Sequence, residues 1–331
     1  MPNQRIVHYQ RKRRPGANYS LEHIFEDVRR RLGERLDFEQ VIAPFTSQGF
    51  SRRLLIAIDA WMRQGDITHI TGDITFAALL LNPRKTVLTV LDCGILHRKK
   101  GIKRWLIKKI WFDWPMARCR WVTTISQSAA TDLLKECSVD AKKLRVIPVA
   151  ISDSFRFSAK PFDEQCPRIL QIGTAPNKNI ERLIEALRGI SCRLVIIGRI
   201  SEEISKRLQS AQITYENYHS LSQEEVVREY TLADLICFVS TYEGFGMPIL
   251  EAQATGRVVV TSDRFSMPEV AGDGALLANP ESIPSIREAI IRIIQDRSLR
   301  DQLIENGTKN IQRFRGDVIA LQFEDLYRSL P

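Results

Sequence analysis

Several features are missing from this sequence of 331 residues, and each absence argues against a class of protein. No apolar run is long enough to span a bilayer, so we expect no transmembrane helix. No apolar segment follows the basic residues of the N-terminus, so we expect no signal peptide. The six cysteines are scattered, without a Cys-x-x-Cys pair or a histidine spacing typical of zinc sites, which indicates free thiols in a reducing cytosol. Internal repeats and low-complexity segments are also absent.

The residues that are present are those of an ordinary globular protein, with 44% hydrophobic and 26% charged residues. A chain of this length is long for one hydrophobic core and suits two α/β domains. The formal net charge of +9 favours an anionic partner, which charge alone leaves open as a nucleotide, an acidic membrane surface or a nucleic acid. Because no nucleic-acid-binding motif accompanies the basic residues, we do not expect nucleic acid as a partner.

The segment 240–261, STYEGFGMPILEAQATGRVVVT, follows an apolar run that predicts a strand. Pro248 suits the first turn of a helix, where its missing N–H costs nothing, and Gly256 is typical of a helix end. Glu243 should therefore lie in the loop after the strand, and Glu251 about one turn into the helix. Two such carboxylates can accept hydrogen bonds from pairs of hydroxyls, while amides at a helix N-terminus can donate to phosphate.

Taken singly, each of these residues is common in helix starts and tight turns. Together, Glu243-Gly-Phe-Gly-Met-Pro-Ile-Leu-Glu251 resembles the E-x7-E signature of the retaining glycosyltransferases of family four, which share the GT-B fold. The resemblance implies an α/β protein with two Rossmann-like domains facing a central cleft. It also implies that Glu243 contacts the donor sugar and that Glu251 contacts the nucleotide ribose. The turn residues expected around the donor are Gly244, Phe245, Gly246 and Met247.

A second loop resembles the phosphate-binding loop of the same family. From residue 168, RILQIGTAPNKNIERLIEAL predicts a strand, a loop and a helix, with Gly173 ending the strand and Asn179 able to cap the helix. The resemblance implies that Lys178 contacts the donor diphosphate. A lysine beside a helix start is usually only exposed, but in this loop we favour the functional interpretation.

Many members of the family carry an arginine in this loop as well, where this sequence has Thr174 and Asn177. The resemblance therefore leaves two sources for the remaining positive charge at the donor. Either Lys178 and the helix N-terminus carry more of it, or another arginine, such as Arg199 or Arg257, contributes.

In the first half, the apolar run 86–91 predicts a strand that ends at Asp92. The family commonly has His-Asp at this point, whereas here Leu91 replaces the histidine and Asp92 is kept. His97 lies a few residues further on and can supply an imidazole to the same cleft. Asp92 and His97 are therefore both candidates for a catalytic role. The alternative for His97 is an ordinary surface histidine.

The segment 98–121, RKKGIKRWLIKKIWFDWPMARCRW, has no acidic residue from Arg98 through Phe112. Basic residues interleaved with apolar ones, including Trp105 and Trp111, predict an amphipathic helix at an anionic membrane surface. The alternative is a core-packed helix whose lysines and arginines form its solvated face. We favour membrane contact, which predicts a cytoplasmic enzyme bound peripherally to the inner face of the cytoplasmic membrane.

These patterns predict four parts of the chain. Residues 1–155 would form an acceptor-side Rossmann-like domain, and residues 156–167, polar with two prolines, would form a hinge. Residues 168–312 would form the nucleotide-sugar-binding domain, and residues 313–331 a helix that crosses back to the first domain.

The resemblance implies a retaining hexosyltransferase that moves a sugar from a UDP, GDP or ADP donor to a hydroxyl of a lipid-linked carbohydrate acceptor, in cell-surface polysaccharide or lipopolysaccharide synthesis. It implies no cofactor besides the nucleotide sugar and no metal ion, in keeping with the missing Asp-x-Asp motif. Two alternatives keep the fold: a nucleotide-sugar epimerase, and a catalytically silent subunit that binds nucleotide sugar or membrane. The sequence names neither the sugar, the base, the acceptor nor the linkage.

Overall fold

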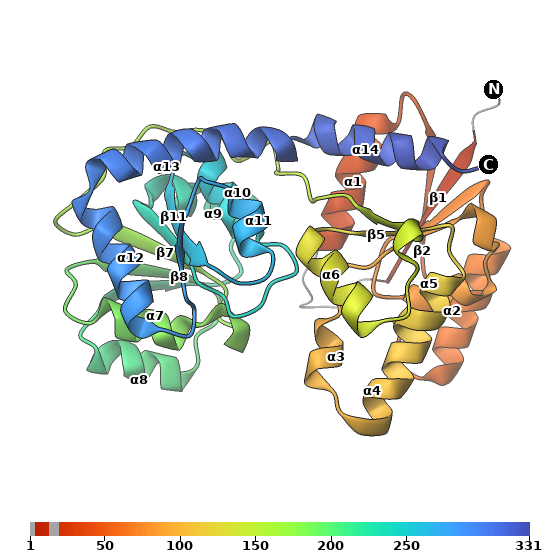
Figure 1. Ribbon diagram of the computed structural model, residues 1–331, viewed down its shortest axis with the longest axis horizontal. Coiled ribbons are helices and arrows are strands. Elements are labelled where there is room, and N and C mark those ends of the chain that lie inside the picture. The colour runs from red at the N-terminus through yellow and green to blue at the C-terminus, as the bar shows by residue number, and fades with distance from the viewer. Residues whose placement is uncertain (1–3, 13–19) are drawn as a thin grey trace. The chain divides into compact units, whose positions relative to one another are not determined.

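The computed structural model describes residues 4–12 and 20–331, and the chain divides into two compact units (Figure 1). The first unit contains residues 1–150 and 316–331, and the second contains residues 151–315. Each unit is built on a six-stranded parallel sheet with helices. Among the described residues, no helix combines the length and apolar character needed to cross a membrane.

The sheet of the first unit has the strand order β2-β1-β3-β4-β5-β6, and every neighbouring pair is parallel. Its central strands are buried on both faces, which explains their apolar sequences. The strands are β1 (Arg5–Gln10), β2 (Asp37–Ile42), β3 (Ile67–Ile70), β4 (Thr86–Thr89), β5 (Trp121–Thr124) and β6 (Leu144–Val146). The helices are α1 (Ser20–Leu32), α2 (Phe50–Met62), η1 (Thr75–Leu80), η2 (Pro83–Lys85), α3 (Gly94–Arg98), α4 (Gly101–Ile107), η3 (Lys108–Asp113), α5 (Trp114–Ala117), α6 (Gln127–Glu136), η4 (Ala141–Lys143) and α14 (Gly316–Arg328).

The C-terminal helix α14, dark blue in Figure 1, packs beside α1 and completes the core of the first unit. The buried hydroxyl of Tyr327 on α14 lies 2.9 Å from His8 Nε2 and 2.8 Å from His69 Nδ1. The other nitrogen of His69 lies 2.7 Å from the hydroxyl of Thr89. Burial lowers the pKa of His69 to about 3, so this imidazole is neutral at physiological pH. Three strands and the last helix are thereby joined by one buried polar network.

The sheet of the second unit has the order β12-β11-β10-β7-β8-β9, again all parallel. Its strands are β7 (Arg168–Ile172), β8 (Arg193–Ile197), β9 (Thr214–Tyr218), β10 (Leu235–Phe238), β11 (Val258–Ser262) and β12 (Leu276–Ala278). The helices are η5 (Pro176–Lys178), α7 (Ile180–Leu187), α8 (Glu202–Ser210), α9 (Gln223–Leu232), α10 (Met247–Ala254), α11 (Met267–Ala271), α12 (Ile283–Gln295), α13 (Arg297–Asn310) and η6 (Ile311–Phe314).

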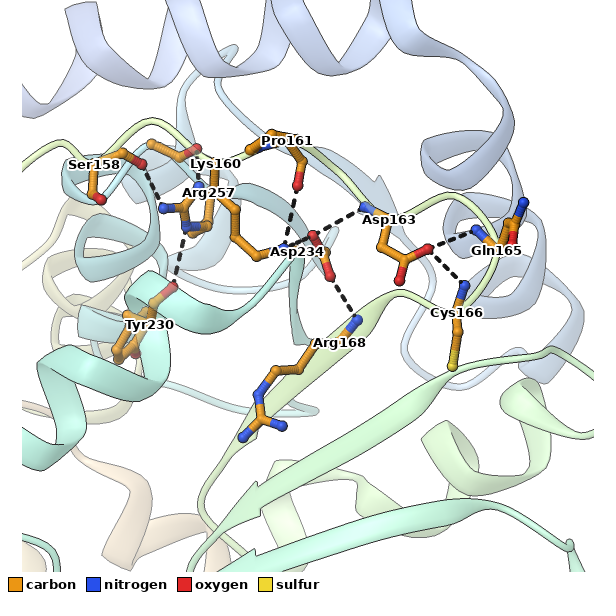
Figure 2. Close-up of polar contacts among 11 residues, drawn as sticks. Ser158, Lys160, Pro161, Asp163, Gln165, Cys166, Arg168, Tyr230, Asp234 and Arg257 are labelled. Atoms are coloured by element: carbon orange, nitrogen blue, oxygen red, sulfur yellow. Dashed lines mark hydrogen bonds and ion pairs between the residues drawn. The ribbon is translucent and has the colours of Figure 1, made fainter.

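The segment 156–167, expected as a hinge, lies inside the second unit, where polar contacts fix it (Figure 2). The buried carboxylate of Asp234 accepts hydrogen bonds from the backbone N–H groups of Asp163, at 3.2 Å, and Arg168, at 2.8 Å. The same carboxylate forms an ion pair with Lys160. The chain passes between the two units after residue 150 and again after residue 315.

Arg257, one of the two arginines considered as a cation for the donor, is also held in this network (Figure 2). It is buried, and its guanidinium donates to the carbonyl oxygens of Ser158, at 2.5 Å, and Tyr230, at 3.2 Å. Arg257 precedes β11, so it lies at the amino ends of the strands, whereas ligands bind at the carboxyl ends. Its proposed contribution to the donor site is therefore wrong.

Candidate active site

The strand order of the second unit creates a switch point between β7 and β10. From β7 the chain moves outward through β8 and β9, and β10 then returns to the other side of β7 and continues through β11 to β12. The loops that leave two such neighbouring strands diverge at their carboxyl ends and leave a crevice for a ligand. The loop after β7 carries Lys178 and the loop after β10 carries Glu243, so the fold brings the two predicted loops to one edge.

The two loops are joined by an ion pair. Lys178 Nζ lies 2.7 Å from Glu243 Oε1, and the two side chains are 20% and 15% exposed. Asn177 Nδ2 lies 3.2 Å from the same oxygen and 3.0 Å from the carbonyl oxygen of Tyr242. The ammonium of Lys178 also lies 4.6 Å from the centre of the Phe238 ring, which favours a cation at this place. Charges of both signs are thus held at the mouth of the crevice.

The backbone at the end of β7 is shaped for the side chain of Lys178. Gly173 has φ of 84°, and a Cβ atom there would lie 3.0 Å from Lys178 Cε, so only glycine suits this position. The hydroxyl of Thr174 donates to the carbonyl oxygen of Arg199 at 2.7 Å and fixes the following turn. The guanidinium of Arg199 is exposed, so this arginine remains a candidate for the donor, unlike Arg257.

Asn179 stands at the start of α7 but does not cap it as expected. Its backbone is left-handed, with φ of 60°, and its side chain accepts no hydrogen bond from the helix amides. Instead, the side-chain amide donates to the carbonyl oxygens of Val239, at 2.9 Å, and Pro280, at 2.7 Å. Asn179 therefore ties the loop after β7 to the segments after β10 and β12.

The loop that holds Glu243 is fixed by hydrogen bonds from Ser266, which the sequence analysis missed. The hydroxyl of Ser266 lies 2.9 Å from the carbonyl oxygen of Glu243 and 2.7 Å from that of Phe245. The Phe245 ring is buried and packs edge-on against Phe314, with ring centres 5.8 Å apart. Of Phe245, therefore, only the backbone is available to contact a bound nucleotide sugar. Gly246, with φ of 118°, is the N-cap of α10. This helix ends before Gly256, which has φ of 75°, as the sequence predicted.

Glu251 lies on α10 and is partly buried. The hydroxyl of Tyr230 donates a 2.5 Å hydrogen bond to Glu251 Oε2. Burial raises the pKa of the Glu251 carboxyl to about 7, although the Tyr230 hydrogen bond and the charge of Lys178 both act to lower it. This carboxylate is thus poised to change its charge near neutral pH.

In the first unit, the two catalytic candidates lie in the loop after β4 and on α3. Asp92 Oδ1 accepts a 2.8 Å hydrogen bond from the backbone N–H of Gly94. His97 Nε2 lies 2.9 Å from Asp132 Oδ2 on α6, and the His97 side chain is 40% exposed. The sequence analysis missed Asp132, which lies 35 residues further along the chain.

Within the basic, aromatic segment 98–121, α4, η3 and α5 follow one another without a break and form one helix over residues 101–117, with a π-helical stretch at η3, so the expected helix is present. Pro115 has no N–H, so the carbonyl oxygen of Trp111 lacks its usual helical donor, and the hydroxyl of Thr75 donates to it at 2.5 Å. Trp111 packs edge-on against Phe76, with ring centres 5.6 Å apart, and Arg53 lies 4.6 Å from its ring centre. Trp111 therefore belongs to the packing of the first unit, whereas Trp105 is 55% exposed.

Residues 153–310 match the family model described as glycosyl transferases group 1. O-antigen chain mannosyltransferase B of Escherichia coli is 25% identical over 269 residues, which cover 73% of this chain and 68% of that protein. O-antigen chain mannosyltransferase RfbU of Salmonella typhimurium is 29% identical over 57% of this chain. The matched part spans only about half of RfbU, at 56%.

Solved structures resemble the whole chain at low identity. Sucrose-phosphate synthase from Thermosynechococcus elongatus has a TM-score of 0.80 at 17% identity, with 98% of each chain covered. Anabaena Alr3699/HepE, solved with UDP and glucose, has a TM-score of 0.78 at 16% identity, covering 99% of this chain and 100% of that one.

The two parallel six-stranded sheets and these neighbours show the GT-B fold, which confirms the expected fold class. Residues 153–310, nearly all of the second unit, match the group 1 glycosyl transferases, in agreement with the family expected from the sequence.

Proposed function

We propose that this glycosyltransferase moves a hexosyl group, with retention of anomeric configuration, from a nucleotide-diphosphate sugar to a hydroxyl of a carbohydrate acceptor. The observation that carries the proposal is the Lys178–Glu243 pair at the switch point, with Glu251 on α10, the helix that directly follows the loop of Glu243. A lysine, two carboxylates and a helix N-terminus at one sheet edge offer partners for phosphate, sugar and ribose together.

In the proposed reaction, the bond between the anomeric carbon and the leaving phosphate oxygen breaks, and the acceptor oxygen bonds to that carbon from the same face. The acceptor proton passes to the leaving phosphate oxygen, so no covalent enzyme nucleophile is needed. Negative charge develops on the diphosphate as the bond breaks, so positioned donors there lower the barrier. We assign this role to Lys178 and to the amides of residues 244–247, in place of a metal ion.

We assign the remaining contacts by the chemistry of each side chain. Glu243 and Asn177 are hydrogen-bonded to each other and would orient the hydroxyls of the donor sugar. Glu251, once ionised, would accept both ribose hydroxyls. Asp92 and His97 in the first unit would bind and orient the acceptor hydroxyl.

The donor and acceptor follow from the relatives rather than from the geometry. Both named bacterial relatives are O-antigen mannosyltransferases, so a mannosyl nucleotide is the first donor to test. A structural neighbour was solved with UDP and glucose, so UDP-glucose is the second. The proposed acceptor is a growing, lipid-linked polysaccharide chain of the cell surface.

The test is to incubate the protein with UDP, GDP and ADP sugars and to measure release of free nucleotide with and without membrane extract. Turnover that requires the extract supports the transferase. Isomerised donor without acceptor would instead show an epimerase, and donor binding without turnover a silent binding subunit. Either result would overturn the proposal.

We further propose that the first unit lies on the inner face of the cytoplasmic membrane. On α4, Ile102 is 78% exposed, Trp105 is 55% exposed and Leu106 is 43% exposed, within a stretch of lysines and arginines. The nearby helix α2, which contacts η3 through Arg53 and Trp111, exposes Phe50 at 83%. Exposed apolar side chains among basic residues suit an anionic lipid surface.

Flotation with anionic vesicles tests this membrane contact. Replacing Ile102 and Trp105 by alanine should lower the affinity for anionic vesicles at least about tenfold. Each replacement removes about one to a few kcal/mol of binding free energy from apolar burial. The control Leu321→Ala removes a 48% exposed side chain from α14 and should change nothing. Trp111→Ala should lower the melting temperature rather than vesicle binding. Unchanged flotation of the double variant would refute the membrane contact.

A further inference from the structure

Three side chains of metal-ligand type meet in the first unit. Cys93 precedes α3, His97 lies on α3, and Asp132 lies on the neighbouring helix α6 (Figure 1). Asp132 Oδ2 is 3.1 Å from Cys93 Sγ and 2.9 Å from His97 Nε2. All three ligand atoms lie within 4.8 Å of one another.

The distances fit a tetrahedral ion with little rearrangement. Zinc binds thiolate sulfur at about 2.3 Å and imidazole nitrogen or carboxylate oxygen at about 2.0–2.2 Å, so its ligand atoms lie about 3.3–3.8 Å apart. The separations from Asp132 Oδ2 to Cys93 Sγ and to His97 Nε2 are a few tenths of an ångström shorter, as expected where hydrogen bonds hold the atoms together. Small side-chain rotations would open the set around an ion.

The surroundings brace the two helices that supply these ligands. Arg104 on α4 donates from Nε to the carbonyl oxygen of Leu96 on α3, at 3.2 Å, and its guanidinium pairs with Glu136 on α6. Cys93 is fully buried, and the 40% exposed His97 leaves the set open to solvent on one side. A braced set with one open side is suited to an ion that keeps one site for water.

We propose that Cys93, His97 and Asp132 bind one zinc ion, with water as the fourth ligand. Thiolate and imidazole select zinc over magnesium or calcium, which prefer oxygen ligands. On binding, Zn²⁺ replaces the thiol proton of Cys93, which is released to solvent. The ion takes His97 Nε2 and leaves Nδ1 for the acceptor contact proposed above, so it links α3 to α6 and holds the His97 ring in place. This zinc site departs from the metal-free protein expected from the sequence and is independent of the donor chemistry.

The sequence analysis missed this site because only two of its three ligands are close together in the chain. Cys93 and His97 are four residues apart, a spacing that places two side chains on one face of a helix. A Cys-x-x-x-His pair alone is too common to indicate zinc. Asp132 completes the set only through the packing of α6 against α3.

Cobalt substitution tests the site without donor, acceptor or turnover. The metal-stripped protein is titrated with Co²⁺, and a thiolate-to-metal charge-transfer band with the visible bands of tetrahedral cobalt should appear at one equivalent. Zn²⁺ should abolish both bands, and it should raise the melting temperature of the protein. Asp132→Asn and Cys93→Ser should each weaken metal affinity at least about 100-fold.

The controls separate this site from stray thiols. Cys166→Ser removes an exposed thiol and Cys119→Ser a buried one that donates to the carbonyl oxygen of Pro115, so both should keep the bands. Should Cys93→Ser fail to fold, Asp132→Asn retains the shape of the side chain and decides the question. Absence of a stoichiometric band in the wild-type protein, or its persistence in Asp132→Asn, would overturn the proposal. Loss of the band in Cys166→Ser would show adventitious binding.

Discussion

Lys178 and Glu243 are partners of each other, with Nζ and Oε1 2.7 Å apart. In the proposed function, the lysine contacts the donor diphosphate and the glutamate contacts the donor sugar, which are adjacent groups of one molecule. The ion pair would then set the spacing of the two contacts, and each residue would hold the charge of the other in place. A donor that binds here must exchange part of this ion pair for its own contacts.

Glu243→Gln should lower kcat at least about 100-fold, because the amide cannot supply the charge that orients both Lys178 and the sugar. The fold should persist, since glutamine can still accept from Lys178. Lys178→Met should lower kcat by a similar factor. Nucleotide release under saturating donor measures both. Lys206→Met, in an exposed pair with Glu202, is the matched control and should behave as wild type. Near-normal turnover of Glu243→Gln would remove the assigned role.

The carboxyl of Glu251 should cost stability above neutral pH and contribute donor affinity there. Its pKa is about 7 in the folded protein and 4.5 in the reference state, so the folded state binds more protons between these values. Stability is therefore lost as the pH rises from 4.5 to about 7.

Glu251→Gln should consequently stabilise the second unit by about 1–3 kcal/mol at pH 8 and by little below pH 5. The same change should weaken binding of a nucleoside diphosphate about tenfold at pH 8, because a neutral amide is a poorer acceptor for ribose hydroxyls. Urea denaturation and calorimetric titration measure the two effects. Glu288→Gln, an exposed change on α12, is the control. Destabilisation by Glu251→Gln at pH 8 would contradict the account.

Ser266 positions the loop that carries Glu243 and should matter for rate more than for stability. Ser266→Ala leaves the carbonyl oxygens of Glu243 and Phe245 without their shared hydroxyl, which costs about 1 kcal/mol of stability. Because the loop is then free to shift, kcat should fall about tenfold. Ser205→Ala, which removes a hydroxyl that contacts Tyr215, should leave kcat unchanged. An equal loss in both variants would mean that Ser266 has no special role.

Local signals in the sequence predicted the elements, and long-range packing decided the contacts. Pro248 and Gly256 correctly placed α10, because helix starts and ends depend on neighbouring residues. The pattern at Asn179 correctly indicated a helix start. The side chain nevertheless does not cap the helix, because its amide donates to two carbonyl oxygens of distant loops.

The same distinction separates the site residues that the sequence identified from those that it missed. Lys178 and Glu243 lie in recognisable motifs, although nothing local showed that they pair. Ser266 and Asp132 act on residues 23 and 35 positions away, so only the fold reveals them. Trp111 lies in a segment whose composition is typical of a membrane-facing helix, but its ring packs against Phe76.

The buried histidines predict acid sensitivity of the first unit. Burial lowers the pKa of His69 to about 3 and also lowers that of His8, which lies next to His69 and Arg29. The unfolded chain binds protons on both residues below about pH 6.5, while the folded chain does not. Stability should therefore fall as the pH drops from 6.5 towards 3, by at most about 1.4 kcal/mol per pH unit for each histidine.

His69→Gln should flatten this slope, because glutamine can still bond the hydroxyls of Tyr327 and Thr89 but does not titrate. His23→Gln removes an exposed histidine from α1 and should leave the slope unchanged. Amide hydrogen exchange of β1 and β3 between pH 7 and pH 4 in urea reports on the first unit alone. A slope in His69→Gln as steep as in the wild type would assign the acid sensitivity to other groups, because only the contribution of His8 should then remain.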